Sequence, residues 1–201
     1  MTLNSNEPLI RQRFEEAASL TRLAQEQLAP RIAAAADAIV AAYRNGGGVF
    51  LFGNGGSAAD AQHMAGELVG RFLKNRRALK AEALTVNSSV LTALANDFGY
   101  QSVFARQLEA NAKSGDVAVA LSTSGNAPSV IAAMKQAKAM GLTTIALTGR
   151  GGGQCAALAD ILLDIPSDQT PRIQEVSTIV YHVLCELVEA QAGAADLPGV
   201  R

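Results

Sequence analysis

The chain has 201 residues, of which 49% are hydrophobic and 17% charged, and its formal net charge is -1. This composition predicts one globular domain with a packed core. Basic and acidic residues are nearly balanced, and no basic run is longer than Arg76-Arg77, which disfavours direct nucleic-acid binding. Residues 1–17 lack the apolar centre of a signal peptide, and no segment is apolar enough to cross a bilayer. We therefore expect a cytoplasmic protein with no membrane partner.

Residues 1–45 predict a pair of helices. Residues 7–27 are rich in charged and helix-favouring types, and Pro30 suits the first turn of a second helix. Glycines 46–48 end that second helix. Because the pair is apolar and precedes the rest of the fold, we expect it to form an oligomer interface.

Short apolar runs alternate with helical segments between residues 46 and 192. The runs predict five strands, at residues 49–52, 81–86, 116–121, 143–147 and 161–165. Helices are expected between them, with a last helix at about 171–190. This alternation predicts an α/β fold, with a five-stranded parallel sheet flanked by helices in a flavodoxin-like arrangement. The whole chain, 1–201, then forms a single domain, and residues 193–201 are a frayed tail.

A glycine-rich turn follows the first predicted strand. Its sequence is Gly53-Asn54-Gly55-Gly56-Ser57, and a predicted helix begins at its end. Backbone N–H groups at such a turn converge on an anion, and the helix dipole adds attraction. The spacing also passes the dinucleotide fingerprint, but the second strand ends at Asn87-Ser88-Ser89 without the acidic residue that holds a ribose. A plain connection between strand and helix stays a third interpretation.

A hydroxyl-rich loop follows the third predicted strand. It reads Ser122-Thr123-Ser124-Gly125-Asn126, and it lies at the carboxyl end of a parallel strand, where ligands of such sheets bind. Clustered hydroxyls and helix-terminal N–H groups can satisfy a phosphomonoester without a lysine. An ordinary serine cap would not need a third hydroxyl. Together, the two loops favour a phosphate ligand.

The chain has only two histidines, and each has a polar companion on its helix. His63 and Glu67 are four residues apart, on the face opposite the apolar stripe of their helix, and this spacing suits one metal ion as well as a solvated helix face. Gln174 and His182 lie off the apolar stripe of the last helix, two turns apart. They could reach one ligand only if it lay beside that helix.

Taken together, these motifs resemble the phosphoheptose isomerases of the SIS (sugar isomerase) family over nearly the whole chain. The resemblance is carried by the two loops and by Asp60-Ala61-Gln62-His63 with Glu67, Asn96-Asp97-Phe98-Gly99, and Arg172-Ile173-Gln174-Glu175 with His182. It implies the conversion of sedoheptulose 7-phosphate to D-glycero-D-manno-heptose 7-phosphate through an enediol or enediolate, in the synthesis of ADP- or GDP-heptose precursors. It also implies a homotetramer with its sites at subunit interfaces.

The resemblance assigns roles to particular positions. It implies that the phosphosugar is bound by Asn54, Gly55, Gly56, Ser57, Glu67, Asn96, Asp97, Ser122, Thr123, Ser124 and Gln174. It implies a zinc cofactor held by His63, Glu67, Gln174 and His182. Glu67 and His182 are also the implied catalytic acid/base pair. A residue that ligates zinc directly is a poorer proton carrier, so these two roles are in tension.

Two positions depart from the family pattern, and other functions stay open. Ala127 stands where many relatives have a substrate-contacting serine, and Ser177 stands where a histidine is common. A sensor, or an isomerase for another phosphosugar, is therefore an alternative. A second is a non-catalytic SIS regulator resembling the DnaA initiator-associating protein, which keeps the phosphate loops but lacks the acid equivalent to Glu67 and the later histidine. Because this chain has both, we favour the isomerase.

Overall fold

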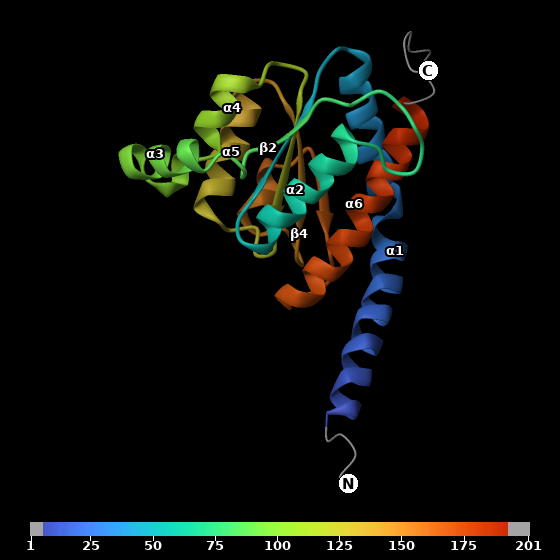
Figure 1. Cartoon of the computed structure of the whole chain (residues 1–201). Helices are drawn as coiled ribbons and strands as arrows, with labels where there is room; N and C mark the ends of the chain where they lie inside the picture. The colour runs from blue at the N-terminus through green and yellow to red at the C-terminus, as the bar shows by residue number, and fades with distance from the viewer. Residues whose placement is uncertain (1–5, 193–201) are drawn as a thin grey trace.

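The computed structural model describes residues 6–192 and consists of one sheet covered by helices on both faces (Figure 1). The predicted tail at 193–201 lies outside the described residues. The strands are β1 (Val49–Gly53), β2 (Ala81–Ala83), β3 (Val117–Ser122), β4 (Thr143–Thr148) and β5 (Ile161–Asp164). The helices are α1 (Glu7–Arg44), α2 (Gly56–Val69), α3 (Ser88–Phe98), α4 (Ala105–Asn111), α5 (Pro128–Ala139) and α6 (Thr170–Ala192). Two 3₁₀ turns, η1 (Tyr100–Ser102) and η2 (Gly153–Leu158), complete the chain.

All strand pairs are parallel, and the strand order is β2-β1-β3-β4-β5. This confirms the predicted five-stranded α/β fold. In this order the chain direction across the sheet reverses between β1 and β3, which is the point where such sheets bind ligands. Gly53 pairs with Leu121 at the ends of these two strands. The glycine-rich turn and the hydroxyl loop therefore leave the sheet side by side.

Side chains of each strand alternate between two apolar cores. Val49 and Leu51 of β1 face the core formed with α1, α2 and α6. Phe50 and Phe52 face the other core, formed with α4 and α5. Because both sheet faces are covered, β1, β3 and most of β4 are buried throughout, which is why they read as continuous apolar runs in the sequence.

The prediction of two N-terminal helices was wrong, because α1 is a single helix of 38 residues with Pro30 inside it. One buried stripe, from Ala24 and Leu28 to Ile32, continues across the proline and packs on the same core. Pro30 itself lies on the exposed face of the helix. There the carbonyl that loses its helical hydrogen bond can be hydrated, so packing outweighs the local cost of the proline.

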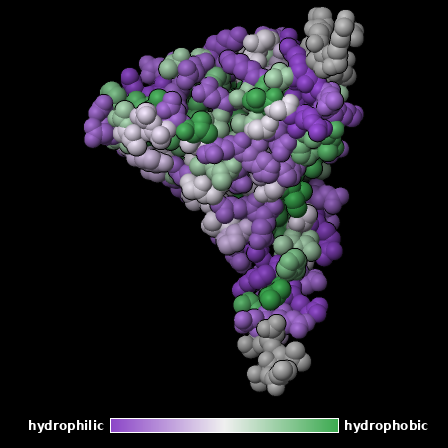
Figure 2. Space-filling model, viewed as in Figure 1, coloured by the Kyte–Doolittle hydropathy of each residue, from purple (hydrophilic) through white to green (hydrophobic). Residues whose placement is uncertain are grey.

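The first turns of α1 extend away from the rest of the molecule (Figure 1). Leu9 and Ile10 are exposed on this extension, and Phe14 is 75% exposed. The space-filling view shows hydrophobic side chains along it (Figure 2). Within residues 6–192, no helix combines the length and the apolar character that crossing a membrane requires.

Candidate functional site

The glycine-rich turn connects β1 to α2 by a tight path that depends on two of its glycines. A Cβ atom at Gly53 would lie 2.7 Å from the carbonyl oxygen of Leu121 on β3, too close for any other residue. Gly55, at the N-cap of α2, has a φ of 57°, which favours glycine. The turn therefore brings the N-terminus of α2 up to the end of β3, as the sequence predicts.

A pocket of about 210 Å³ lies between the two loops. Its lining residues are Asn54, Ser57, Leu121, Ser122, Thr123, Ser124 and Ala127. The structure thus brings five of the predicted phosphosugar-binding side chains to one cavity. Ala127, the departure from the family pattern, also lines the cavity and contributes a methyl group where a hydroxyl would otherwise stand.

Two residues that the sequence analysis missed fix the side chain of Asn54. Its Nδ2 atom donates to Oγ of buried Ser129 at 3.0 Å, and its Oδ1 atom accepts from the hydroxyl of Tyr100 at 2.9 Å. The amide orientation is thereby set by one donor and one acceptor on different elements. No local sequence signal marks these partners, because α5 and η1 meet the turn only in the folded chain.

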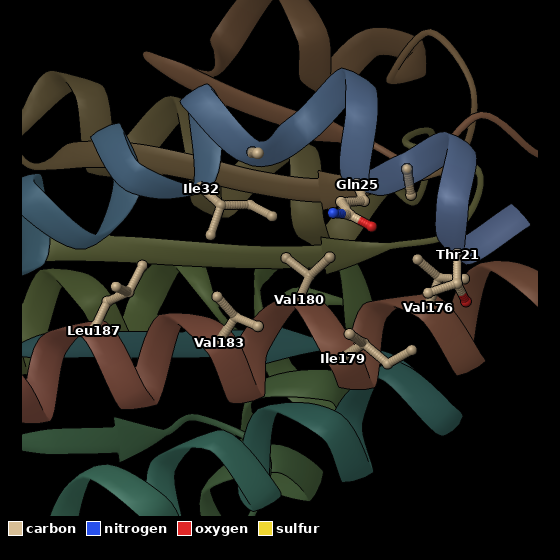
Figure 3. A pocket seen from close by; sticks show the side chains of 10 residues that line it. Thr21, Gln25, Ile32, Val176, Ile179, Val180, Val183 and Leu187 are labelled. Atoms are coloured by element: carbon tan, nitrogen blue, oxygen red, sulfur yellow. The ribbon is translucent and has the colours of Figure 1, made fainter.

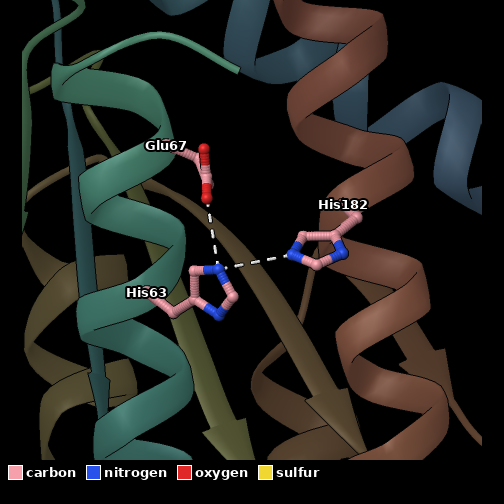
Figure 4. A group of neighbouring side chains, drawn as sticks. All are labelled: His63, Glu67 and His182. Carbon is pink, nitrogen blue, oxygen red and sulfur yellow. Dashed lines mark hydrogen bonds and ion pairs between the residues drawn. The ribbon is translucent and has the colours of Figure 1, made fainter. Parts of the chain in front are cut away.

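A second polar group lies between α2 and α6 and consists of His63, Glu67 and His182 (Figure 4). Nε2 of His63 is 3.1 Å from Oε1 of Glu67 and 3.4 Å from Nε2 of His182. His63 is exposed, and the other two are partly buried. Residues from two distant helices therefore present two nitrogens and one carboxylate oxygen to a common point, all within 4.8 Å of one another.

The donors of this group fit a metal ion. Ligand atoms around a tetrahedral ion with bonds of about 2.0–2.1 Å are separated by about 3.3 Å, close to the two measured distances. Imidazole and carboxylate are ligands of divalent transition metals. Two facing Nε2 atoms also need a hydrogen or a cation between them, because two lone pairs repel.

The hydroxyl of Tyr181 contacts this group on the side of the His63 ring that faces away from Glu67 and His182. It lies 3.0 Å from Nδ1 of His63, and also within reach of Oγ1 of Thr178 at 3.4 Å and Oδ1 of Asp60 at 3.5 Å. Burial raises the pKa of Tyr181, so the phenol stays protonated near neutral pH. Burial also raises the pKa of Asp60, which the hydrogen bond from Tyr181 opposes. Sequence reasoning missed Tyr181, because it lies within the apolar pattern of its helix, and named Asp60 only as part of a motif, without a role.

Comparison with known proteins identifies the family. The family model described as SIS domain matches residues 13–149. The chain belongs to the SIS domain family.

The relatives of this SIS domain include curated proteins and solved structures named phosphoheptose isomerase. The one from Aquifex aeolicus is 52% identical over 176 residues, which cover 88% of this chain and 92% of the relative. The one from Rhodospirillum rubrum is 52% identical over 161 residues, covering 80% and 86%. The structure from Neisseria gonorrhoeae matches with a TM-score of 0.88 at 39% identity, covering 92% of this chain and all of the other.

Other predicted residues of the SIS domain lie apart from both groups within the single chain. Asn96 and Asp97 are exposed near the end of α3, where they hydrogen-bond to each other at 2.7 Å, and neither is among the residues lining the pocket. Ser177 is buried, and its hydroxyl donates to the carbonyl of Ile173 in its own helix. Ser177 therefore adds no polar group to the site surface.

Gln174 lies against the glycine-rich turn. A Cβ atom at Gly56 would collide with the amide of Gln174. Along α6, Gln174 precedes His182 by eight residues, or about 12 Å of helix axis. The amide thus lies beside the glycine-rich turn, and His63 and His182 lie farther along α2 and α6. Its role as a zinc ligand stays a prediction.

A buried ion pair fixes the end of α2 that carries Glu67. The carboxylate of Glu189 on α6 accepts the backbone N–H groups of Phe72, Leu73 and Lys74 at 2.7–2.8 Å and pairs with Arg76 at 3.1 Å. Arg76 also donates to the backbone carbonyl of Glu67 at 2.7 Å. Burial disfavours the ionised carboxylate, but these donors outweigh it and hold the pKa of Glu189 below its ordinary value.

Proposed function

We propose that this SIS domain is a sedoheptulose 7-phosphate isomerase that forms D-glycero-D-manno-heptose 7-phosphate in the synthesis of ADP- or GDP-heptose precursors. The observation that carries the proposal is the arrangement along α2: the helix begins at a phosphate-type pocket and presents His63 and Glu67 to His182 farther along. The names of the relatives point to the same activity.

The phosphate end of the substrate fits the pocket between the two loops. Ser57, Ser122, Thr123 and Ser124 line it, and the N-terminus of α2 adds backbone N–H groups and a favourable dipole. Ser57 and His63 are six residues apart on α2, or about 9 Å along its axis. That spacing accommodates an extended sugar phosphate of six or seven carbons, with its carbonyl end at the histidines.

The carbonyl end needs a group that removes a proton beside the carbonyl and a group that handles protons on oxygen. We assign the first role to Glu67 and the second to His182. Glu67 is held in place by the Arg76 contact to its backbone and by His63. Nε2 of His63 contacts both side chains (Figure 4), which supports a base and an acid that act on the same substrate atoms from two helices.

We further propose that the metal is zinc, held by His63, Glu67 and His182, with Gln174 as the fourth ligand implied by the family resemblance. Bound there, the ion would polarise the substrate carbonyl. Glu67 can serve as both ligand and base if one carboxylate oxygen holds the ion and the other takes the proton. The donor spacing described above supports the first three ligands, His63, Glu67 and His182.

A homotetramer with sites at subunit interfaces is proposed on two observations. An apolar groove of about 320 Å³ runs between α1 and α6, lined mainly by aliphatic side chains (Figure 3). Its outer wall includes Ile179 and Val183, which are 45% and 38% exposed. Phe14, Leu9 and Ile10 leave further apolar surface uncovered near the start of α1. A second copy of the chain is the occupant that would bury both.

The regulator resembling the DnaA initiator-associating protein is the less favoured function. The chain retains Glu67 and His182, and the structure brings them together with His63. The sugar phosphate substrate class also supports the cytoplasm as the place of action.

Incubation of the purified protein with sedoheptulose 7-phosphate, followed by NMR of the sugar carbons, tests the function. We expect an aldose phosphate signal to appear at the expense of the ketose. In deuterated water, deuterium should enter the carbon beside the carbonyl, because the proton passes through Glu67. Absence of the aldose at substrate concentrations that saturate binding would refute the isomerase.

A further inference from the structure

Tyr181 occupies an unusual position for a tyrosine whose hydroxyl faces a polar group. The residue is 1% exposed and belongs to the core beneath α6. Its ring nevertheless meets His63 edge to face, with centroids 5.4 Å apart, and its hydroxyl reaches Nδ1 of that histidine. The proposed mechanism assigns nothing to this contact.

The contact involves the nitrogen of His63 that faces away from Glu67 and His182. Nε2 of His63 points to the common centre of the group (Figure 4). Its Nδ1 atom lies 3.0 Å from the hydroxyl of Tyr181. A neutral imidazole carries one hydrogen, on one nitrogen or the other. A metal at the centre requires a lone pair on Nε2, so the hydrogen must then sit on Nδ1 and needs an acceptor.

The tyrosine oxygen can be that acceptor because its own hydrogen has other partners. Oγ1 of Thr178 lies 3.4 Å from the hydroxyl, and Oδ1 of Asp60 lies 3.5 Å from it. Asp60 is on α2, one turn before His63, so the three groups form a chain from the imidazole to a carboxylate. Partners of this kind fix the tautomer and the orientation of a ligating histidine.

We propose that Tyr181 is a positioning residue that holds His63 as its Nδ1–H tautomer, with Asp60 and Thr178 receiving the phenol hydrogen, and so prepares Nε2 to bind the metal ion. The proposal rests on the metal site of the proposed function. It gives the hydroxyl of Tyr181 a role distinct from packing, since phenylalanine would fill the same space.

Zinc affinity measured by competition with a chromogenic chelator is the direct test. Tyr181→Phe keeps the ring and removes the hydroxyl, and we expect the dissociation constant for zinc to rise roughly 10- to 100-fold. Asp60→Asn keeps an acceptor oxygen without the charge and should give a smaller rise. The matched control is Tyr43→Phe. The buried hydroxyl of Tyr43 has no hydrogen-bond partner within residues 6–192, so its removal should leave the zinc affinity unchanged.

Histidine nitrogen NMR gives a second readout that does not depend on activity. With only two histidines in the chain, the His182→Gln variant assigns both sets of signals. We expect the Nδ1–H tautomer for His63 in the zinc-loaded protein, where the ion occupies Nε2. In zinc-loaded Tyr181→Phe this N–H has lost its acceptor, so its signal should change chemical shift and exchange faster with solvent.

The results of these measurements test the role of Tyr181 independently of the isomerase activity. Equal zinc affinity and an unchanged Nδ1–H signal of His63 in Tyr181→Phe would overturn the inference, even if the protein is an active isomerase. A wild-type protein that binds zinc, loses affinity in Tyr181→Phe and has no isomerase activity would uphold the inference and refute the function. A wild-type protein that binds no zinc would overturn both the inference and the metal assignment.

Discussion

Nε2 of His182 lies 3.4 Å from Nε2 of His63, although 119 positions separate the two residues in the chain. At this distance the two imidazoles must share a hydrogen or a cation. The carboxylate of Glu67 beside them favours positive charge at that point. The chemistry of the site therefore depends on whether a hydrogen or a metal cation lies between the two imidazole rings.

Removal of the metal should inactivate the protein and lower its stability. Dialysis against a strong chelator should abolish turnover of sedoheptulose 7-phosphate, and added zinc should restore it. Zinc at 100 times its dissociation constant should raise the free energy of unfolding by about 2.7 kcal/mol, because it binds only the native state. Thermal denaturation with and without zinc measures this. The His182→Gln variant is the control and should show a much smaller shift, and a metal-free protein with full activity would contradict the assignment.

The substitution Glu67→Gln should remove the base while preserving the phosphate pocket. We expect kcat to fall by roughly 10²- to 10⁴-fold, the usual contribution of a positioned base. Binding of the sugar phosphate, measured by calorimetry, should change far less, because the proposed phosphate ligands, Ser57 and the hydroxyl loop, are unchanged. Glu186→Gln, at an exposed position of α6, is the matched control. Wild-type turnover in Glu67→Gln would exclude Glu67 as the base.

The substitution Phe14→Asp should weaken the assembly. It places a charge on the exposed apolar surface of α1, which a second copy of the chain would otherwise bury. Light scattering should report a smaller mass than for the wild-type protein at the same concentration. Ser19→Asp introduces the same charge on the opposite side of α1 and should leave the mass unchanged. Equal masses for wild type and Phe14→Asp would argue against this surface as the interface.

The substitution Gly125→Ala should disturb the hydroxyl loop. Gly125 has a φ of 64°, and an added Cβ atom would collide with the carbonyl oxygen of Gly152. We expect a loss of more than about 2 kcal/mol in the free energy of unfolding by urea, together with weaker sugar phosphate binding. Gly115→Ala is the control, because Gly115 has a φ of 88° but no atom within 4 Å of the added Cβ. It should cost only about 1 kcal/mol. Similar losses in both variants would show that the contact with Gly152 contributes nothing.

The substitution Glu189→Gln should change both the stability and its dependence on acid. Leaving Arg76 buried without its partner should cost about 3 kcal/mol. Because the native pKa of Glu189 lies below its ordinary value of 4.5, its ionisation stabilises the fold above that pH, and this contribution disappears as the pH falls through the lower native value. The wild-type protein should therefore lose stability on acidification more steeply than Glu189→Gln. Glu15→Gln, on the surface of α1, controls for the change in net charge. Parallel pH profiles for wild type and Glu189→Gln would contradict this account.

Much of the fold could be predicted because its signals are local. Continuous apolar runs marked the buried strands, and glycines at 53 and 55 marked the turn that only glycine can form. The continuation of α1 through Pro30 could not be predicted, because local rules favour the start of a new helix at a proline. The single helix is explained only by the packing of Leu28 and Ile32, on either side of the proline, against the same core.

The sequence named several residues that the fold brings together, but few of the contacts between them. The positions of His63, Glu67 and His182 followed from motifs, but no spacing in the sequence indicates that the first two meet the third. That contact depends on how α2 and α6 lie side by side. For the same reason Tyr181 could not be recognised, because in the sequence it belongs to the apolar stripe of its helix. Ser129 and Tyr100 could not be recognised because their partner, Asn54, is far away in the sequence.

The location of Glu189 and His182 on the last helix has a consequence for synthesis. A ribosome makes the chain from the N-terminus at roughly 5–20 residues per second, so several seconds to tens of seconds pass between the appearance of His63 and that of His182. Throughout that time the loop after α2 lacks the carboxylate that holds it. A nascent chain interrupted before α6 would lack His182 and also the apolar side chains with which α6 completes one core, so truncated translation products should not convert the substrate.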